Sequence, residues 1–209
     1  LGSLAGLNMF ITNGAVLDIS ARVGGVSIAS LISAAGTAVH LGSRTLTVER
    51  FDFTFSSHAH GVIDGTGGLT VGQNFTLNLY AGNTFTGPTT LTTAASAINV
   101  RAANAISASS EVNLAASGAT LNIGAAPADV SIRALRGVAG SIVTVFNNNL
   151  VITNAASDFA GIIKPAFGVV TGGLILNGGH QTLSGINTYL GATTVNAGTL
   201  SVNGSTATS

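Results

Sequence analysis

Apolar and polar residues alternate in short runs along much of the chain. The clearest runs cover residues 15–19, 44–48, 75–79 and 199–203. An alternation with a period of two is typical of β-strands that bury one face. Glycine, asparagine or serine pairs such as Asn13-Gly14 bound most of these runs, and those residues favour tight turns. The pattern therefore predicts many short strands joined by turns.

Helical periodicity is weak throughout the sequence. The best candidate is the alanine-rich stretch 96–109, but Asn99, Val100 and Asn104 interrupt its apolar face. We therefore predict an all-β chain.

The chain also repeats itself at an offset of 104 residues. Leu17 then falls on Leu121, and the Val-Ser-Ile run at 26–28 falls on the same run at 130–132. The offset becomes 105 where Gly-Gly-Leu at 67–69 meets its copy at 172–174. The drift is confined to the stretch from Glu49 to Gly67, which favours a loop there on a repetitive scaffold. We predict two units, 1–104 and 105–209, within one continuous solenoid.

Short strands with frequent turns are typical of the successive coils of a β-solenoid. With roughly 20 residues per coil, each unit would make about five coils. A single coil cannot bury its own apolar side chains, so each coil must stack on the next.

The composition agrees with such stacking and excludes some partners. Charged residues make up only 7% of the chain and aromatic residues 5%, whereas apolar residues reach 46% and glycine contributes 28 positions. Small and β-branched apolar side chains suit a narrow, repetitive core. Seven basic and seven acidic residues cancel without forming a basic run, so we expect no nucleic-acid partner.

Membrane insertion and cysteine chemistry are not expected either. Serine, threonine, asparagine and glycine break every apolar run before it is long enough for a transmembrane helix. The absence of cysteine excludes disulfides and thiolate metal sites. The chain begins Leu1-Gly2-Ser3 without an initiator methionine or a signal peptide, so we expect it to be part of a longer protein.

Part of the second unit resembles a known secretion-related repeat. Its segments 172–176, 183–189 and 191–200 resemble the autotransporter-associated β-strand repeat, found in the passenger domains of type V secretion proteins of Gram-negative bacteria. The first unit carries a weaker version at 67–71 and 82–90 and departs from the pattern after Leu91. The resemblance implies a right-handed parallel β-helix exported to the cell surface. Many such passengers are adhesins, some form fibres, and some carry enzymes in separate regions.

Two histidines raise the question of a metal site. His58 and His60 are two residues apart, so on a strand their side chains would share a face. A stable site needs a third ligand, for which only Asp52 and Asp64 are near in sequence. Because these residues lie in the variable stretch, we interpret them as part of a solvated loop and predict no metal or cofactor.

Acidic residues in the same stretch raise the question of glycoside cleavage. Glu49, Asp52 and Asp64 include potential carboxylate pairs, but the matching region of the second unit offers only Asp158 and Lys164. The low charge and the scarcity of aromatic residues argue against a catalytic groove. We predict no catalytic residues, and a carbohydrate-active enzyme stays as an alternative hypothesis.

Three further motifs have simple structural interpretations. The segment from Asp64 to Gly68 resembles calcium-binding repeats but does not recur, which favours a turn. Arg133 and Arg136, with Asp129 nearby, are typical of a surface ion pair. Threonine pairs at 89–90 and 193–194 are candidates for outward ladders, but two pairs so far apart form no flat array.

The sequence thus predicts an extracellular structural or adhesive segment of a surface protein of a Gram-negative bacterium. Its repeats would provide length, and its loops would contact a cell-surface or glycan receptor. An alternative is a filament subunit that self-associates through the ends of the solenoid, where unpaired strand edges invite another copy.

Overall fold

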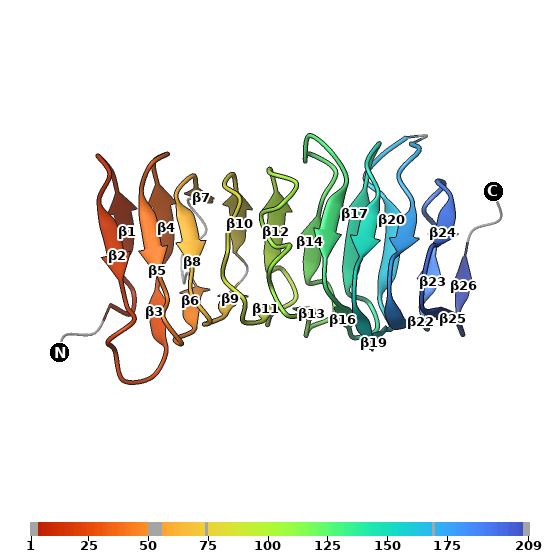
Figure 1. Cartoon of the computed structure of the whole chain (residues 1–209), viewed down its shortest axis with the longest axis horizontal. Coiled ribbons are helices and arrows are strands. Elements are labelled where there is room, and N and C mark those ends of the chain that lie inside the picture. The colour runs from red at the N-terminus through yellow and green to blue at the C-terminus, as the bar shows by residue number, and fades with distance from the viewer. Residues whose placement is uncertain (1–3, 50–55, 74, 169, 207–209) are drawn as a thin grey trace.

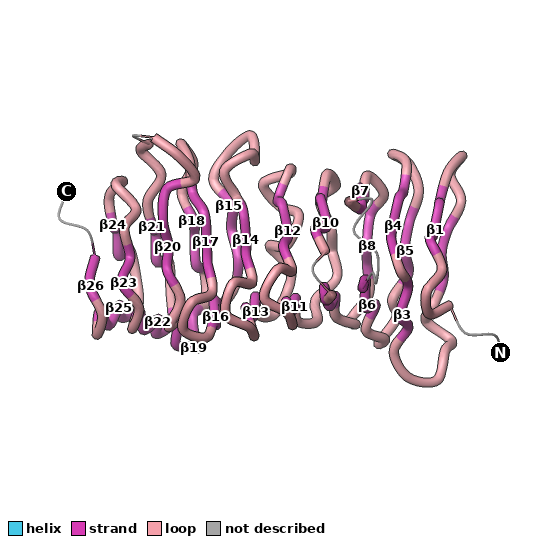
Figure 2. Tube along the Cα trace, turned by 180° about the vertical axis from the view of Figure 1, so that it is seen from behind, coloured by secondary structure: helices cyan, strands magenta, loops and turns pink. Residues whose placement is uncertain are grey.

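The chain folds into a parallel β-solenoid of about eight turns, elongated along the stacking direction (Figure 1). The structure, a computed structural model, describes residues 4–49, 56–73, 75–168 and 170–206. Among these residues it contains strands, turns and loops but no helix (Figure 2), and hence no helix that could cross a membrane. The predicted all-β solenoid is confirmed.

Two long sheets run along the rod, and both contain strands from each half of the chain. The first is eight-stranded and comprises β1 (Asn8–Ile11), β4 (Ser30–Ser33), β7 (Ser57–Ala59), β10 (Thr76–Leu79), β12 (Ala97–Val100), β14 (Thr120–Asn122), β17 (Ile142–Val145) and β20 (Ile162–Pro165). The second is nine-stranded and comprises β3 (Val26–Ile28), β6 (Leu46–Glu49), β9 (Leu69–Gly72), β11 (Thr89–Leu91), β13 (Val112–Leu114), β16 (Leu135–Gly137), β19 (Ala155–Phe159), β22 (Gly179–Leu183) and β25 (Thr199–Val202).

Shorter sheets form the remaining side of the coil. Near the N-terminus this side is β2 (Val16–Asp18), β5 (Ala38–His40) and β8 (Val62–Asp64). Later turns have β15 (Val130–Ile132), β18 (Leu150–Ile152), β21 (Leu174–Leu176) and β24 (Thr193–Val195) on this side. A two-stranded sheet of β23 (Ile186–Asn187) and β26 (Ser205–Thr206) instead continues the side of the eight-stranded sheet, because β23 stacks on β20. All of these pairings are parallel, as expected when each coil stacks on the next.

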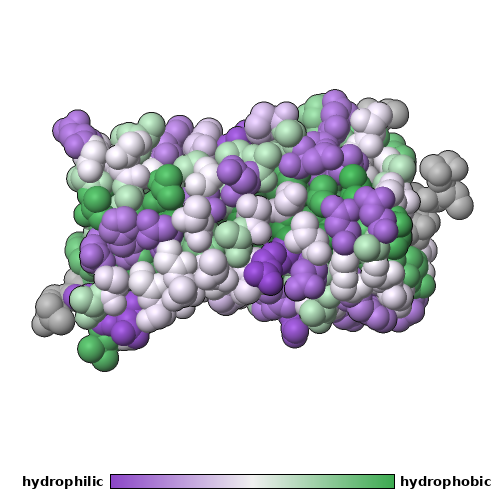
Figure 3. All heavy atoms as spheres, in the orientation of Figure 1, coloured by the Kyte–Doolittle hydropathy of each residue, from purple (hydrophilic) through white to green (hydrophobic). Residues whose placement is uncertain are grey.

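Because apolar and polar residues alternate, the apolar side chains of successive turns stack in columns inside the coil. In β6, for example, Leu46 and Val48 are fully buried, whereas Thr47 and Glu49 between and beyond them are partly exposed. Leu46 pairs with Leu69, which in turn pairs with Thr89 of the next coil. The buried residues form one continuous core along the rod, and the face of the molecule in Figure 3 mixes hydrophilic and hydrophobic residues.

The length of a turn varies along the rod. Paired positions are 19 residues apart between Gln181 and Leu200 but 26 apart between Ile32 and His58. The longest of these spacings includes residues 50–55, which lie outside the described part of the chain.

The 104-residue offset does not equal a whole number of turns. Val26 lies in the nine-stranded sheet, but its match Val130 lies in the four-stranded sheet. Leu31 lies in the eight-stranded sheet, whereas Leu135 lies in the nine-stranded one. Matched positions therefore share a local strand-and-turn pattern while facing different sides. The division into units 1–104 and 105–209 stays a prediction, as does the hand of the coil.

The expectation of a loop between Glu49 and Gly67 is wrong for most of its described part. Residues 57–59 form β7 and residues 62–64 form β8, both paired in register with neighbouring turns. Extra residues in this stretch lengthen one turn without removing its strands.

Candidate functional site on the outer face of the nine-stranded sheet

The two close-set histidines join an aromatic stack on the surface. His58 lies on β7, and His60 follows that strand. The ring of Tyr80, one turn later, stacks on His60 with centroids 4.1 Å apart and on His58 at 5.9 Å. Within the described residues, no group of three histidine, aspartate or glutamate side chains is placed to hold a metal ion.

The two described carboxylates considered for glycoside cleavage, Glu49 and Asp64, lie on different sheets. Asp64 lies on β8 and contacts His40 of the preceding turn, with Oδ2 2.8 Å from Nδ1. Glu49 ends β6 in a different sheet, and Asp52 lies outside the described residues.

Gly65 occupies a turn with φ of 109°. A side chain at Gly65 would collide with the backbone of Gly42, which fits the predicted turn.

The first of the two threonine pairs considered for an outward ladder contributes only one side chain to such a column. Thr89 points into the coil and donates from its Oγ1 to the hydroxyl of Ser109, 3.0 Å away. Thr90 is partly exposed and pairs with Thr70, which pairs with Thr47. The outward column therefore belongs to single threonines of successive turns and includes only one member of the pair.

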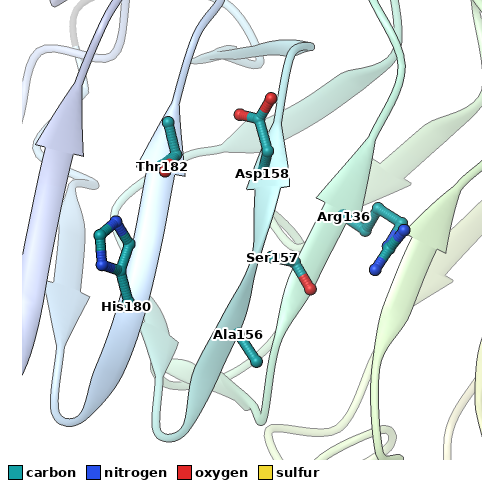
Figure 4. A pocket seen from close by; sticks show the side chains of 6 residues that line it. All are labelled: Arg136, Ala156, Ser157, Asp158, His180 and Thr182. Carbon is teal, nitrogen blue, oxygen red and sulfur yellow. The ribbon is translucent and has the colours of Figure 1, made fainter.

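Further along the nine-stranded sheet, the same outer face carries charged side chains. A shallow hollow of about 290 Å³ lies over β16, β19 and β22 (Figure 4). Its side chains come from three successive turns and point away from the core: Arg136, Ala156, Ser157, Asp158, His180 and Thr182. Parallel register brings them together, because Ala156 pairs with His180 and Asp158 with Thr182.

Glu111 anchors one edge of this hollow. Its Oε1 accepts a hydrogen bond from Nε of Arg136 at 3.0 Å and another from the hydroxyl of Ser157 at 2.6 Å. The glutamate thus spans three turns of the solenoid. The ion pair expected for Arg136 exists, but its partner is Glu111, because Asp129 instead accepts hydrogen bonds from Asn149.

At the opposite edge of the hollow, serine hydroxyl groups contact Asp158 and His180. Ser184 donates to both carboxylate oxygens of Asp158, at 2.9 and 3.1 Å. The hydroxyl of Ser201 lies 3.1 Å from Nε2 of His180. Beneath the face, the buried amide of Gln181 donates to the carbonyls of Leu135 and Ser157, which ties three neighbouring strands together.

The hollow is equipped to bind a polar ligand on a rigid sheet. It offers a guanidinium, a carboxylate, an imidazole and a threonine hydroxyl on a surface that water reaches freely. Sequence reasoning named Arg136 and Asp158 but missed Glu111 and His180. Glu111 carried a signal, since it is the only acidic residue between Asp64 and Asp129 in a sequence poor in charge.

Comparison with known proteins adds no relative. The chain matches none of the protein-family models, curated proteins or solved structures with which it was compared.

Proposed function

We propose that the chain is a structural and adhesive segment of an exported bacterial surface protein, in which a stiff rod provides length and carries contact sites for another surface. The observation that carries this proposal is the pair of long parallel sheets, which contain strands from both halves of the chain around one core. Each added turn extends such a rod by one strand spacing of about 4.8 Å without changing its cross-section.

The resemblance of residues 172–200 to the autotransporter-associated repeat supports a place at the surface of a Gram-negative cell. In this proposal, a right-handed parallel β-helix is exported and presents its sides to the outside. Glycine and asparagine at the turns are compatible with that role, because they allow coils to stack closely whatever the outward side chains are.

The adhesive part of the proposal rests on the unequal distribution of charge. Arg136, Asp158 and Glu111 gather on one face of a chain that has few charged residues. A polar, solvent-facing patch on a rigid sheet is suited to fast, specific contact with another surface.

Adherence of coated beads tests the function. Beads that carry the purified chain should bind cultured epithelial cells more than uncoated beads do. The double variant Arg136→Gln/Asp158→Asn should lower this adherence several-fold. The matched control Lys164→Gln/Asp64→Asn, which also removes one positive and one negative charge, should leave it unchanged.

The outcomes separate the parts of the proposal. Adherence no greater than that of uncoated beads would contradict the adhesive role. Equal adherence of both double variants would show that the contact with the cells is made elsewhere than at the hollow. Small-angle X-ray scattering should give a rod of constant cross-section at low concentration, and growth of its length with concentration would favour a self-assembling filament.

A further inference from the structure

Three consecutive corners of the solenoid are built differently from the rest. They connect the eight-stranded sheet to the four-stranded sheet, and their described residues are 123–129, 146–149, and 166–168 with 170–173. The described parts of the first and the last are longer than the four-residue corners at 12–15 and 34–37, and they project from the rod beside β14 and β20 (Figure 1).

Two successive asparagines, Asn148 and Asn149, fasten these corners to one another. Asn148 is buried, and its Nδ2 donates to the carbonyls of Ile123 at 2.7 Å and Ala128 at 3.2 Å in the preceding corner. Asn149 accepts a hydrogen bond at Oδ1 from the backbone N–H of Gly173, 2.9 Å away in the following corner. These bonds fix the corner loops before any ligand arrives, which lowers the entropic cost of binding.

The carboxylate of Asp129 completes this fastening on the outer side. It accepts from the backbone N–H of Asn149 at 2.7 Å and from the Nδ2 of Asn149 at 3.1 Å. Asp129 itself remains exposed, so its carboxylate keeps acceptor capacity on the solvent side.

Two phenylalanine side chains lie on these corner loops. The rings of Phe146 and Phe167 lie 5.1 Å apart and are tilted by 43°. Phe167 is 71% exposed, although most large apolar side chains of the chain are buried in the core. Next to the rings lie two adjoining hollows of about 170 and 160 Å³, which share Gly124 and Phe146.

The two hollows differ in the polarity of their lining. The first is mainly apolar, with Ala125, Ala166 and both phenylalanine rings, and Asn122 is its one polar side chain. The second is bordered by Asp129, Asn147 and Asn148. A small ligand seated here would meet an aromatic face on one side and amide or carboxylate groups on the other.

We propose that the corner formed by Phe146, Phe167, Asn147 and Asp129 binds a neutral sugar ring of a glycan. The C–H groups on one face of a pyranose carry partial positive charge and stack on the negative face of an aromatic ring. The ring hydroxyls of the sugar would then donate to Asp129 and exchange hydrogen bonds with the exposed amide of Asn147.

The charge at the corner selects the ligand class. Among the described residues that line the two hollows, Asp129 is the only one with a charged side chain, so a polyanionic glycan would be repelled. This inference rests on the proposed contact function and names its ligand chemistry at a site other than the hollow over β16, β19 and β22.

Variants of exposed phenylalanines provide a matched test. The purified chain should bind neutral gluco-, manno- or galacto-configured oligosaccharides on an array more strongly than polygalacturonate or heparin. Titration calorimetry with the strongest of these should show about a tenfold weaker affinity for Phe167→Ala. Phe10→Ala, which replaces a phenylalanine 66% exposed at the other end of the rod, should bind like the parent chain.

Several results would overturn the assignment. The assignment fails if the chain binds no neutral oligosaccharide on the array, or if it binds the acidic polymers more strongly. It also fails if Phe167→Ala and Phe10→Ala lose affinity equally. A change from dimer to monomer on Phe167→Ala, measured by light scattering, would assign the corner to self-association instead. Beads that adhere to cells without any sugar binding at the corner would leave the proposed function in place and remove this inference alone.

Discussion

At the scale of single residues, buried asparagines hydrogen-bond to backbone groups of neighbouring turns, which apolar side chains cannot do. Asn83 and Asn187 are matched by the 104-residue offset and are 4% and 0% exposed. The Oδ1 of Asn83 accepts from the backbone N–H of Ile63 at 2.8 Å, and that of Asn187 accepts from the N–H of Ile163 at 2.9 Å. The recurrence of the two asparagines is visible in the sequence, but the alternation of apolar and polar residues does not indicate that a polar side chain points inward.

Replacing Asn83 tests the value of this bond. Asn83→Ala leaves the N–H of Ile63 and the carbonyl of Ala105 without their partner, since the Nδ2 of Asn83 also donates to Ala105 at 2.9 Å. The free energy of unfolding should fall by about 1–3 kcal/mol, as measured by urea denaturation. Asn113→Ala, on the partly exposed side of β13, should change it by less than about 0.5 kcal/mol. Equal losses in the two variants would contradict the role assigned to Asn83.

Asp18 provides a residue-scale prediction for pH. The side chain and the backbone N–H of Ser20 both hydrogen-bond to this carboxylate and, with His40 nearby, hold the pKa of Asp18 below its ordinary value of 3.8. A carboxyl group with a lowered folded-state pKa stabilises the fold above its unfolded-state pKa. That contribution is lost as the pH falls through the folded-state value. Ser20→Ala should raise the pKa of Asp18 toward 3.8 in a carboxyl-carbon NMR titration. An unchanged midpoint would contradict the assigned cause.

At the scale of elements, the strands were easier to predict than the corners between them. The predicted runs 75–79 and 199–203 correspond closely to β10 and β25. By contrast, the stretch that contains β7 and β8 was predicted to be a loop because the repeat register drifts there. A drift of register indicates a change in the length of a turn, but the strands of that turn are kept by pairing with neighbouring turns. The outer-face hollow was also out of reach, because Glu111 and Ser157 meet only through the stacking of turns far apart in sequence.

Glycines at the corners allow consecutive turns to approach closely. A Cβ atom at Gly173 would lie 2.1 Å from the carbonyl oxygen of Ala192 in the next turn, which no ordinary packing permits. The Gly-Gly-Leu motif therefore marks places where two backbones touch.

Substitution of Gly173 measures this constraint. Gly173→Ala should lower the free energy of unfolding by at least about 2 kcal/mol, because the backbone of Ala192 would have to move. In Gly72→Ala, the new methyl group would lie 3.1 Å from the hydroxyl oxygen of Thr92, which can rotate away. That variant should unfold within about 1 kcal/mol of the parent in the same thermal or chemical melt. A tolerated Gly173→Ala would show that the turns can separate at low cost.

At the scale of the whole molecule, the solenoid was predictable but its geometry was not. The repeat signal and the short strands indicated stacked coils, yet coil length varies from 19 residues at Gln181–Leu200 to 26 at Ile32–His58. Small insertions at corners change the length of a turn without disturbing the strand pattern. Periodicity alone therefore cannot say which side of the rod a matched residue faces, as Val26 and Val130 illustrate.

A core substitution in the middle of the rod should have local effects. Leu121 is fully buried on β14 and pairs with Ile98 of the preceding turn and Val143 of the following one. Leu121→Ala should cost about 2–5 kcal/mol through lost burial and a residual cavity. Because each turn contacts mainly its neighbours, the loss of stability should remain concentrated around them.

Hydrogen exchange followed by mass spectrometry measures the reach of this effect. In Leu121→Ala, protection should fall most in peptides that cover β12, β14 and β17, while β3 and β22 keep theirs. Val138→Ala, at a side chain 43% exposed, should leave the whole pattern unchanged. A uniform loss of protection along the rod would mean that the turns unfold as one cooperative unit. A rod that resists such spreading can lose one turn to local damage and still present the contact surfaces of the others.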